Sequence, residues 1–150
     1  MKASDICSRE VITCPSGTTV LEACKIMRAN HVGDIVVVEA TPGGEPRPRG
    51  ILTDRDIVLE VLAREVDAAT VFVDDAMSSP LVVAYGWEDM REVAKRMRLH
   101  AVRRLPVVGQ AGELIGIISL DDLFESTCAL LSELSLVTRR QPHFELKHRA

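Results

Sequence analysis

Two short motifs hold the side chains best suited to binding a polar ligand. Each motif consists of a glycine, two apolar residues and a hydroxyl residue, followed three positions later by an aspartate. Thr53 and Asp56 form one pair, and Ser119 and Asp122 form the other. We expect each pair at the junction between a strand and a helix, where free N–H groups and partial positive charge attract phosphate. A carboxylate one turn further on can accept hydrogen bonds from ribose hydroxyls. The pattern therefore suits the sugar and phosphate of a nucleotide.

The same residues also fit a simpler interpretation, which is helix capping. A Thr or Ser followed three residues later by an acid is a common way to begin a helix, with or without a ligand. The two interpretations are compatible, because one hydroxyl can serve both purposes. The duplication of the motif, each time directly after an expected strand, favours a binding role beside the capping role.

Two adjacent arginines, Arg103 and Arg104, precede the apolar segment 105–108. Arginine offers paired donors that match a phosphate group, although most arginines are simply solvated. An earlier copy of the same segment has Gly33 and Asp34 at these positions. Asp34 would repel a phosphate, since two like charges 4 Å apart cost about 1 kcal/mol even in water. We therefore expect two binding sites that are not equivalent.

The earlier copy belongs to an internal repeat. Residues 5–38 recur at 75–108, and residues 50–57 recur at 116–123 after a longer loop in the first copy. Such a repeat predicts two similar halves that bury their apolar faces on each other. We divide the chain into a first repeat (1–66), a second repeat (67–138) and a polar C-terminal tail (139–150) that we expect to be frayed.

Each repeat carries the pattern strand, helix, strand, strand, helix. In the first helix Thr19 and Glu22 form a capping box ahead of an apolar stripe. The β-branched runs between turn residues predict strands. The expected strands are 11–14, 35–38, 50–52, 81–84, 105–108 and 114–118, and the expected later helices are 54–65, 90–100 and 121–136. The predicted fold class is α/β (α+β), with two β-α-β-β-α repeats.

Composition excludes several classes of function. A net charge of −4 argues against a broad nucleic-acid surface. The N-terminus lacks the apolar centre of a signal peptide and no apolar run reaches the length of a membrane span, so we expect a cytoplasmic protein without membrane contact. The four cysteines show no CxxC spacing, which argues against a zinc site or a redox pair. The sequence contains no Walker A, GxGxxG, HExxH or GxSxG motif. It also has no nucleophile beside a base, so we do not expect an enzyme.

The segments 53–57 and 102–108, in this order and duplicated, resemble the cystathionine-β-synthase (CBS) domain pair. The resemblance covers about residues 3–135 and is strongest to small stand-alone bacterial proteins made of one CBS pair. It implies two repeats packed sheet to sheet with pseudo-twofold symmetry. It also implies clefts that bind AMP, ADP, ATP or S-adenosylmethionine, no covalent cofactor, and a homodimer formed through the CBS pairs. Members of the family sense ligands and perform no chemistry.

The resemblance also implies roles for individual residues. Thr53 and Asp56 would hold phosphate and ribose in one cleft, and Ser119 and Asp122 would do so in the other, where Asp34 intrudes. In the family, basic residues ahead of the apolar strand face the cleft of the opposite repeat. Arg103 and Arg104 would therefore complete the Thr53/Asp56 site. The expected adenine walls are Ile12, Val32, Val82 and Val102.

Three functions compete at this point. The first is a regulatory protein that responds to an adenosyl ligand, and the second is a ligand-free scaffold that only dimerises. The third, and least favoured, is an enzyme that uses Cys14 or Cys128. Only Arg103 and Arg104 are evident cations near the expected site, which favours AMP or ADP over a triphosphate. With no catalytic domain attached, we expect the output to pass to an unknown downstream protein.

Overall fold

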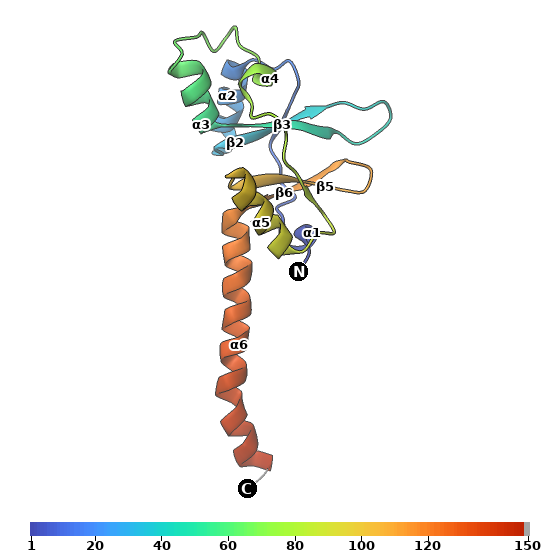
Figure 1. Ribbon diagram of the computed structural model, residues 1–150, viewed down its shortest axis with the longest axis vertical. Helices are drawn as coiled ribbons and strands as arrows, with labels where there is room; N and C mark the ends of the chain where they lie inside the picture. The colour runs from blue at the N-terminus through green and yellow to red at the C-terminus, as the bar shows by residue number, and fades with distance from the viewer. Residues whose placement is uncertain (149–150) are drawn as a thin grey trace.

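The computed structural model describes residues 1–148 and contains two three-stranded sheets. In each sheet the first two strands are parallel and the last two are antiparallel. Both sheets have a register irregularity at the same point of the repeat, after Val37 and after Val107. Figure 1 shows the sheets lying one above the other. The strands are β1 (Thr13–Pro15), β2 (Asp34–Glu39), β3 (Arg47–Thr53), β4 (Ala84–Tyr85), β5 (Arg104–Val108) and β6 (Leu114–Ser119).

The helices complete the predicted β-α-β-β-α pattern in both repeats, so the predicted fold class is confirmed. Thr19 closes the expected capping box with Glu22 at the start of the first long helix. The helix after β3 is shorter than expected and passes into a π-helical turn. The helices are α1 (Ala3–Ile6), α2 (Val20–Asn30), α3 (Asp54–Ile57), the π turn η1 (Val58–Leu62), α4 (Val73–Ala76), α5 (Met90–His100) and α6 (Leu120–His148).

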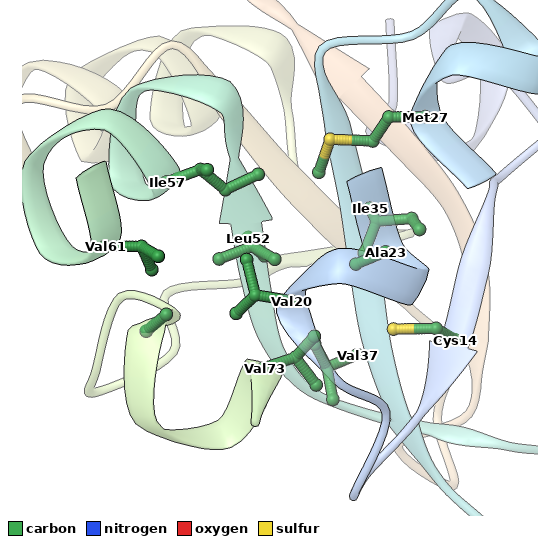
Figure 2. Close-up of a cluster of buried hydrophobic side chains, with 11 residues drawn as sticks. Cys14, Val20, Ala23, Met27, Ile35, Val37, Leu52, Ile57, Val61 and Val73 are labelled. Carbon is green, nitrogen blue, oxygen red and sulfur yellow. The ribbon is translucent and has the colours of Figure 1, made fainter. Parts of the chain in front are cut away.

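Each sheet has its own core, built from aliphatic side chains. Val20, Ile35, Leu52 and Val61 meet in the first core, and each is fully buried (Figure 2). The second core repeats this arrangement around Val93, Leu105 and Ile118. The buried residues of both cores contain no aromatic side chain, as the low aromatic content of the sequence leads one to expect.

The two cores do not coincide with the two sequence repeats. Helix α4 opens the second repeat, yet its Val73 is buried in the first core. Helix α1 opens the first repeat, yet its Ala3 is buried in the second core. Each repeat therefore gives its opening helix to the core of the other, and the halves are interlocked.

The chain that follows each exchanged helix crosses a strand at a glycine. Ser8 pairs with Ile117 of β6, and Ser78 pairs with Ile51 of β3. At Gly116 a Cβ would lie 2.6 Å from Cys7 Sγ and 2.7 Å from the Ser8 carbonyl oxygen. The glycine at each crossing leaves room for the exchanged segment, which at Gly116 includes backbone and at Gly50 the side chain of Met77.

The C-terminal helix is longer than predicted. We expected it to end near residue 136, followed by a frayed tail from 139, but α6 continues for 29 residues to His148. Polarity alone does not end a helix, and the chain has no glycine after Gly116 that could form a C-cap. The helix continues through Pro142, where the sequence would more readily end or kink it. Only the start of α6 packs on the body, and the rest projects away from it (Figure 1). The last two residues of the expected tail, 149–150, lie outside the described residues. No helix among those described combines the length and apolarity that crossing a membrane requires.

Candidate functional site

A cavity of about 460 Å³ lies between the two repeats. Its walls come from the end of β3 and the start of α3 on one side. On the other side they come from the segment before β4, the link between α5 and β5, and the start of α6. The cavity is therefore a feature of the pair of repeats and not of either repeat alone.

Most of the residues predicted to bind a nucleotide lie together at this cavity. Five of the six line it: Thr53, Asp56, Arg103, Arg104 and Ser119. The sequence suggested two separate clefts, one for each motif, whereas here Thr53 and Ser119 face the same space. Asp122 is not among the lining residues.

The expected adenine walls divide into two groups. Val82 and Val102 line the cavity. Val32 lines a different, open groove of about 630 Å³ between α2 and α3, and Ile12 packs against the first core. Only the pair from the second repeat is therefore in reach of a ligand that occupies the cavity between the repeats.

Thr53 and Asp56 form a helix cap. The backbone N–H and the hydroxyl of Thr53 each donate to Asp56 Oδ2 at 2.8 Å, and the Asp56 N–H donates back to Thr53 Oγ1 at 3.1 Å. The hydroxyl of Ser78 reaches the other carboxylate oxygen, Asp56 Oδ1, at 3.3 Å. A carboxylate can accept about four hydrogen bonds. Asp56 accepts three, so it retains capacity for one further donor such as a ribose hydroxyl.

Ser119 and Asp122 repeat this cap closely. The Ser119 N–H and hydroxyl donate to Asp122 Oδ2, both at 2.6 Å, and the Asp122 N–H donates to Ser119 Oγ at 3.2 Å. The capping interpretation of both motifs is thus confirmed. The two motifs differ in what surrounds them, because only Asp56 also lies on the wall of the cavity.

An ion pair links the two repeats beside the cavity. Arg104 Nη1 lies 2.9 Å from Asp34 Oδ2, which joins the start of β5 to the start of β2. Burial raises the pKa of Asp34, opposed by the charge of Arg104 and reinforced by that of Asp54. We predicted Asp34 to be an obstacle to phosphate; in the structure its charge is met by Arg104. Arg103 is exposed on the cavity wall and forms no ion pair within residues 1–148.

The charges on the cavity wall are balanced. Three cations and three carboxylates contribute to it: Arg55, Arg103, Arg104, Asp54, Asp56 and Asp121. Sequence reasoning missed Arg55, Asp54 and Asp121, although they lie inside the two motifs that it selected. It also missed Ser78 and Pro80, which lie in the segment between α4 and β4. No three His, Cys, Asp or Glu side chains of the described chain are grouped so that they could hold a metal ion.

The sequence matches known proteins over most of its length. The family model of the CBS domain matches residues 3–63 and 73–127. The CBS domain-containing protein YhcV of Bacillus subtilis is 36% identical over 119 residues, which cover 79% of this chain and 80% of YhcV. An uncharacterized protein of Methanopyrus kandleri is 30% identical over 83% of this chain, which spans only 62% of that relative's length.

Solved structures share the fold. A CBS domain protein from Pyrobaculum aerophilum, complexed with AMP, has a TM-score of 0.70 and 24% identity, covering 81% of this chain and 89% of that one. The CBS domain pair of a protein in complex with 5-methylthioadenosine and S-adenosyl-L-methionine has a TM-score of 0.72 and 24% identity, covering 86% and 97%. The two matched segments, the two interlocked β-α-β-β-α units and the cavity between them lead to one assignment: the chain belongs to the CBS domain family.

Proposed function

We propose that this protein is a regulatory module that binds an adenosyl ligand in the cavity between its two repeats. The observation that carries the proposal is the convergence of Thr53, Asp56 and Arg103 on one cavity that also has apolar walls. It is supported by the AMP and S-adenosylmethionine complexes of proteins with the same fold. The proposal includes no catalytic step.

Each part of the ligand has a matching part of the wall. The adenine ring would lie between Val82 and Val102, since an aromatic base gains from contact with apolar side chains. The ribose would donate a hydrogen bond to Asp56, and the phosphate would lie near Thr53 and Arg103. Ser119 would contribute its hydroxyl from the opposite side of the same cavity.

The balanced charge of the wall favours a ligand with few charges. Arg104 is already held by Asp34, so Arg103 and Arg55 are the cations left for a phosphate. A triphosphate would bring more negative charge than these two can compensate, and Asp54 and Asp121 would repel it. We therefore favour AMP, ADP or S-adenosylmethionine over ATP.

A ligand in this position would act as a regulator by touching both repeats. It stabilises whichever relative arrangement of the repeats and their partners it binds best, and so shifts an equilibrium that already exists. We infer a homodimer formed through the CBS pairs as the assembly that responds, and a separate downstream protein as the recipient of the signal.

The test compares two matched cap variants, Asp56→Ala and Asp122→Ala. Each removes the same capping box, which costs about 1 kcal/mol of helix stability. Thermal melting is then followed with AMP, ADP, ATP or S-adenosylmethionine in excess. A ligand at a hundredfold its Kd stabilises the folded state by about 2.7 kcal/mol, which raises the melting temperature. We expect a ligand-induced rise in the wild type and in Asp122→Ala, and none in Asp56→Ala.

Two outcomes would contradict the proposal. Equal loss of the ligand effect in both variants would show that the Thr53/Asp56 side of the cavity has no special role. No rise with any of these ligands in the wild type would favour the alternative function, a ligand-free scaffold for dimerisation.

A further inference from the structure

Helix α6 carries an apolar surface that the body of the protein does not cover. Leu120 and Leu123 pack on the second core, but the apolar side chains beyond them are exposed. Each of the following is at least half exposed: Phe124, Leu130, Leu131, Leu134, Val137 and Phe144. In Figure 1 this part of α6 extends away from both sheets. Neither the cavity nor the CBS fold accounts for it.

These side chains follow the spacing of a coiled coil. Leu123, Leu130, Val137 and Phe144 are seven residues apart, and Leu134 falls between two of them at the complementary position. A repeat of three and four residues places them on one seam of a helix, with Leu131 and Phe124 on its flank. The other two seam positions between Leu123 and Phe144 are the polar residues Thr127 and Gln141.

The charges of α6 are divided along its length. Its first half carries the acids Asp121, Asp122, Glu125 and Glu133, whereas its second half carries Arg139, Arg140 and Lys147 with the single acid Glu145. A parallel pair would place acid beside acid and base beside base. An antiparallel pair places the acidic half of one helix beside the basic half of the other. The charge pattern therefore favours a second copy of α6 as the partner, in antiparallel orientation.

One antiparallel register combines an apolar pair at the centre of the seam with opposite charges beside it. Setting Leu134 opposite Val137 of a second copy places Leu130 opposite Gln141 and Thr127 opposite Phe144. The same register places Glu133 beside Arg140 of the second copy, twice by symmetry, at the flanking positions where coiled coils form their interhelical ion pairs. In a parallel pair in register, Glu133 would instead face Thr138.

We propose that α6 is a self-association surface that binds α6 of a second copy of this chain in antiparallel orientation. A helix rises about 1.5 Å per residue, so the exposed part from Phe124 to His148 is about 36 Å long. The two CBS units would lie at opposite ends of this helix pair, where they do not collide. The surface is separate from the cavity, and its pairing does not depend on a bound nucleotide.

A first experiment compares two leucines of α6 in the full-length protein. Leu134 lies on the seam and Leu136 faces away from it, and they are similarly exposed, at 55% and 50%. Sedimentation equilibrium gives the assembly mass of Leu134→Glu and Leu136→Glu. We expect Leu134→Glu to reduce the mass to half or less. The remaining species is a monomer, or a dimer where the CBS units also pair. Leu136→Glu should leave the mass unchanged. Unchanged mass in both variants, or an equal decrease in both, would overturn the proposal.

A second experiment tests the register through charge reversal. Glu133→Arg and Arg140→Glu each replace two attractive contacts with two repulsive ones, and we expect each to weaken self-association at least tenfold. The double variant Glu133→Arg/Arg140→Glu restores both pairs with reversed sign, so its association should return to within about threefold of the wild type. Single variants that associate like the wild type, or a double variant as weak as the singles, would exclude the antiparallel pair. A wild-type chain that is monomeric in solution would exclude it as well and would leave this surface to a different protein.

Discussion

Asp74 links the exchanged helix α4 to the unit that contains β1, β2 and β3. Its carboxylate accepts hydrogen bonds from the Ser16 hydroxyl and from the Gly17 N–H, the latter at 2.7 Å, and it lies 3.6 Å from Arg49 Nε. The hydrogen bond from Ser16 lowers the pKa of Asp74 below its ordinary value of 3.8, against the effect of partial burial and with help from Gly17 and Arg49. The charged form of Asp74 therefore stabilises the folded state.

Asp74→Asn should lower the free energy of unfolding by about 1–2 kcal/mol near neutral pH, since hydrogen bonds to a charged group are lost. The folded pKa lies below the unfolded one, so the contribution is complete above pH 3.8 and is lost as the pH falls through the folded value. Urea unfolding measured against pH should show the gap between variant and wild type closing in that acidic range. The exposed neighbour Asp75 provides the control, and an Asp75→Asn variant with the same pH dependence would contradict the assignment.

The candidate site shows what can be predicted at the scale of residues. Thr53, Asp56 and Ser119 could be selected because a hydroxyl and a carboxylate three residues apart after a strand form a local pattern. The Arg104–Asp34 pair could not, because it joins residues 70 positions apart whose contact depends on how the repeats pack. Asp122 was expected at a binding site for the same local reason as Asp56. Whether such a carboxylate also faces a cavity is decided by the opposite repeat.

At the scale of elements, the two glycine crossings are similar but not equally tight. A side chain at Gly116 would meet the Ser8 backbone oxygen as well as Cys7, whereas at Gly50 the nearest atoms all belong to the flexible side chain of Met77. A flexible side chain can move aside at small cost, and a backbone paired to a strand cannot.

Gly116→Ala should therefore destabilise the protein more than Gly50→Ala. We expect a loss of about 1–3 kcal/mol at Gly116, as for other overpacked sites, and a smaller loss at Gly50 where Met77 can rearrange. Chemical denaturation of the two variants measures the difference directly. Equal losses would mean that Cys7, and not the backbone of Ser8, sets the cost at Gly116.

The elements themselves were mostly predictable, and the misses have physical causes. The capping box at Thr19 and the β-branched run of β2 are local signals, and both lie where expected. Strand β1 was expected at 11–14 but spans Thr13–Pro15, because its ends are set by pairing with β2 and not by its own residues. Helices α1 and α4 have only four residues each, too few to show a periodic pattern, so their packing could not be predicted.

At the scale of the whole molecule, the exchange of α1 and α4 makes the two units depend on each other. Ala3 and Val73 occupy equivalent positions of the repeat and both are fully buried, each in the core of the other repeat. A destabilising substitution in one sequence repeat should therefore lower the stability of the unit formed mainly by the other repeat. A ligand bound in the cavity as proposed would therefore contact two units whose cores depend on each other.

The near-isosteric variants Ala3→Ser and Val73→Thr test this connection. Each places a hydroxyl in an apolar core, at a cost of about 1–3 kcal/mol when the hydroxyl finds no partner. Hydrogen exchange followed by mass spectrometry should show that Ala3→Ser lowers protection most in β5 and β6, and that Val73→Thr lowers it most in β2 and β3. The reverse result would mean that each repeat folds on its own opening helix. A general loss of stability would lower protection equally in both sheets. The expected result is different, because each variant should lower protection most in the sheet of the other repeat.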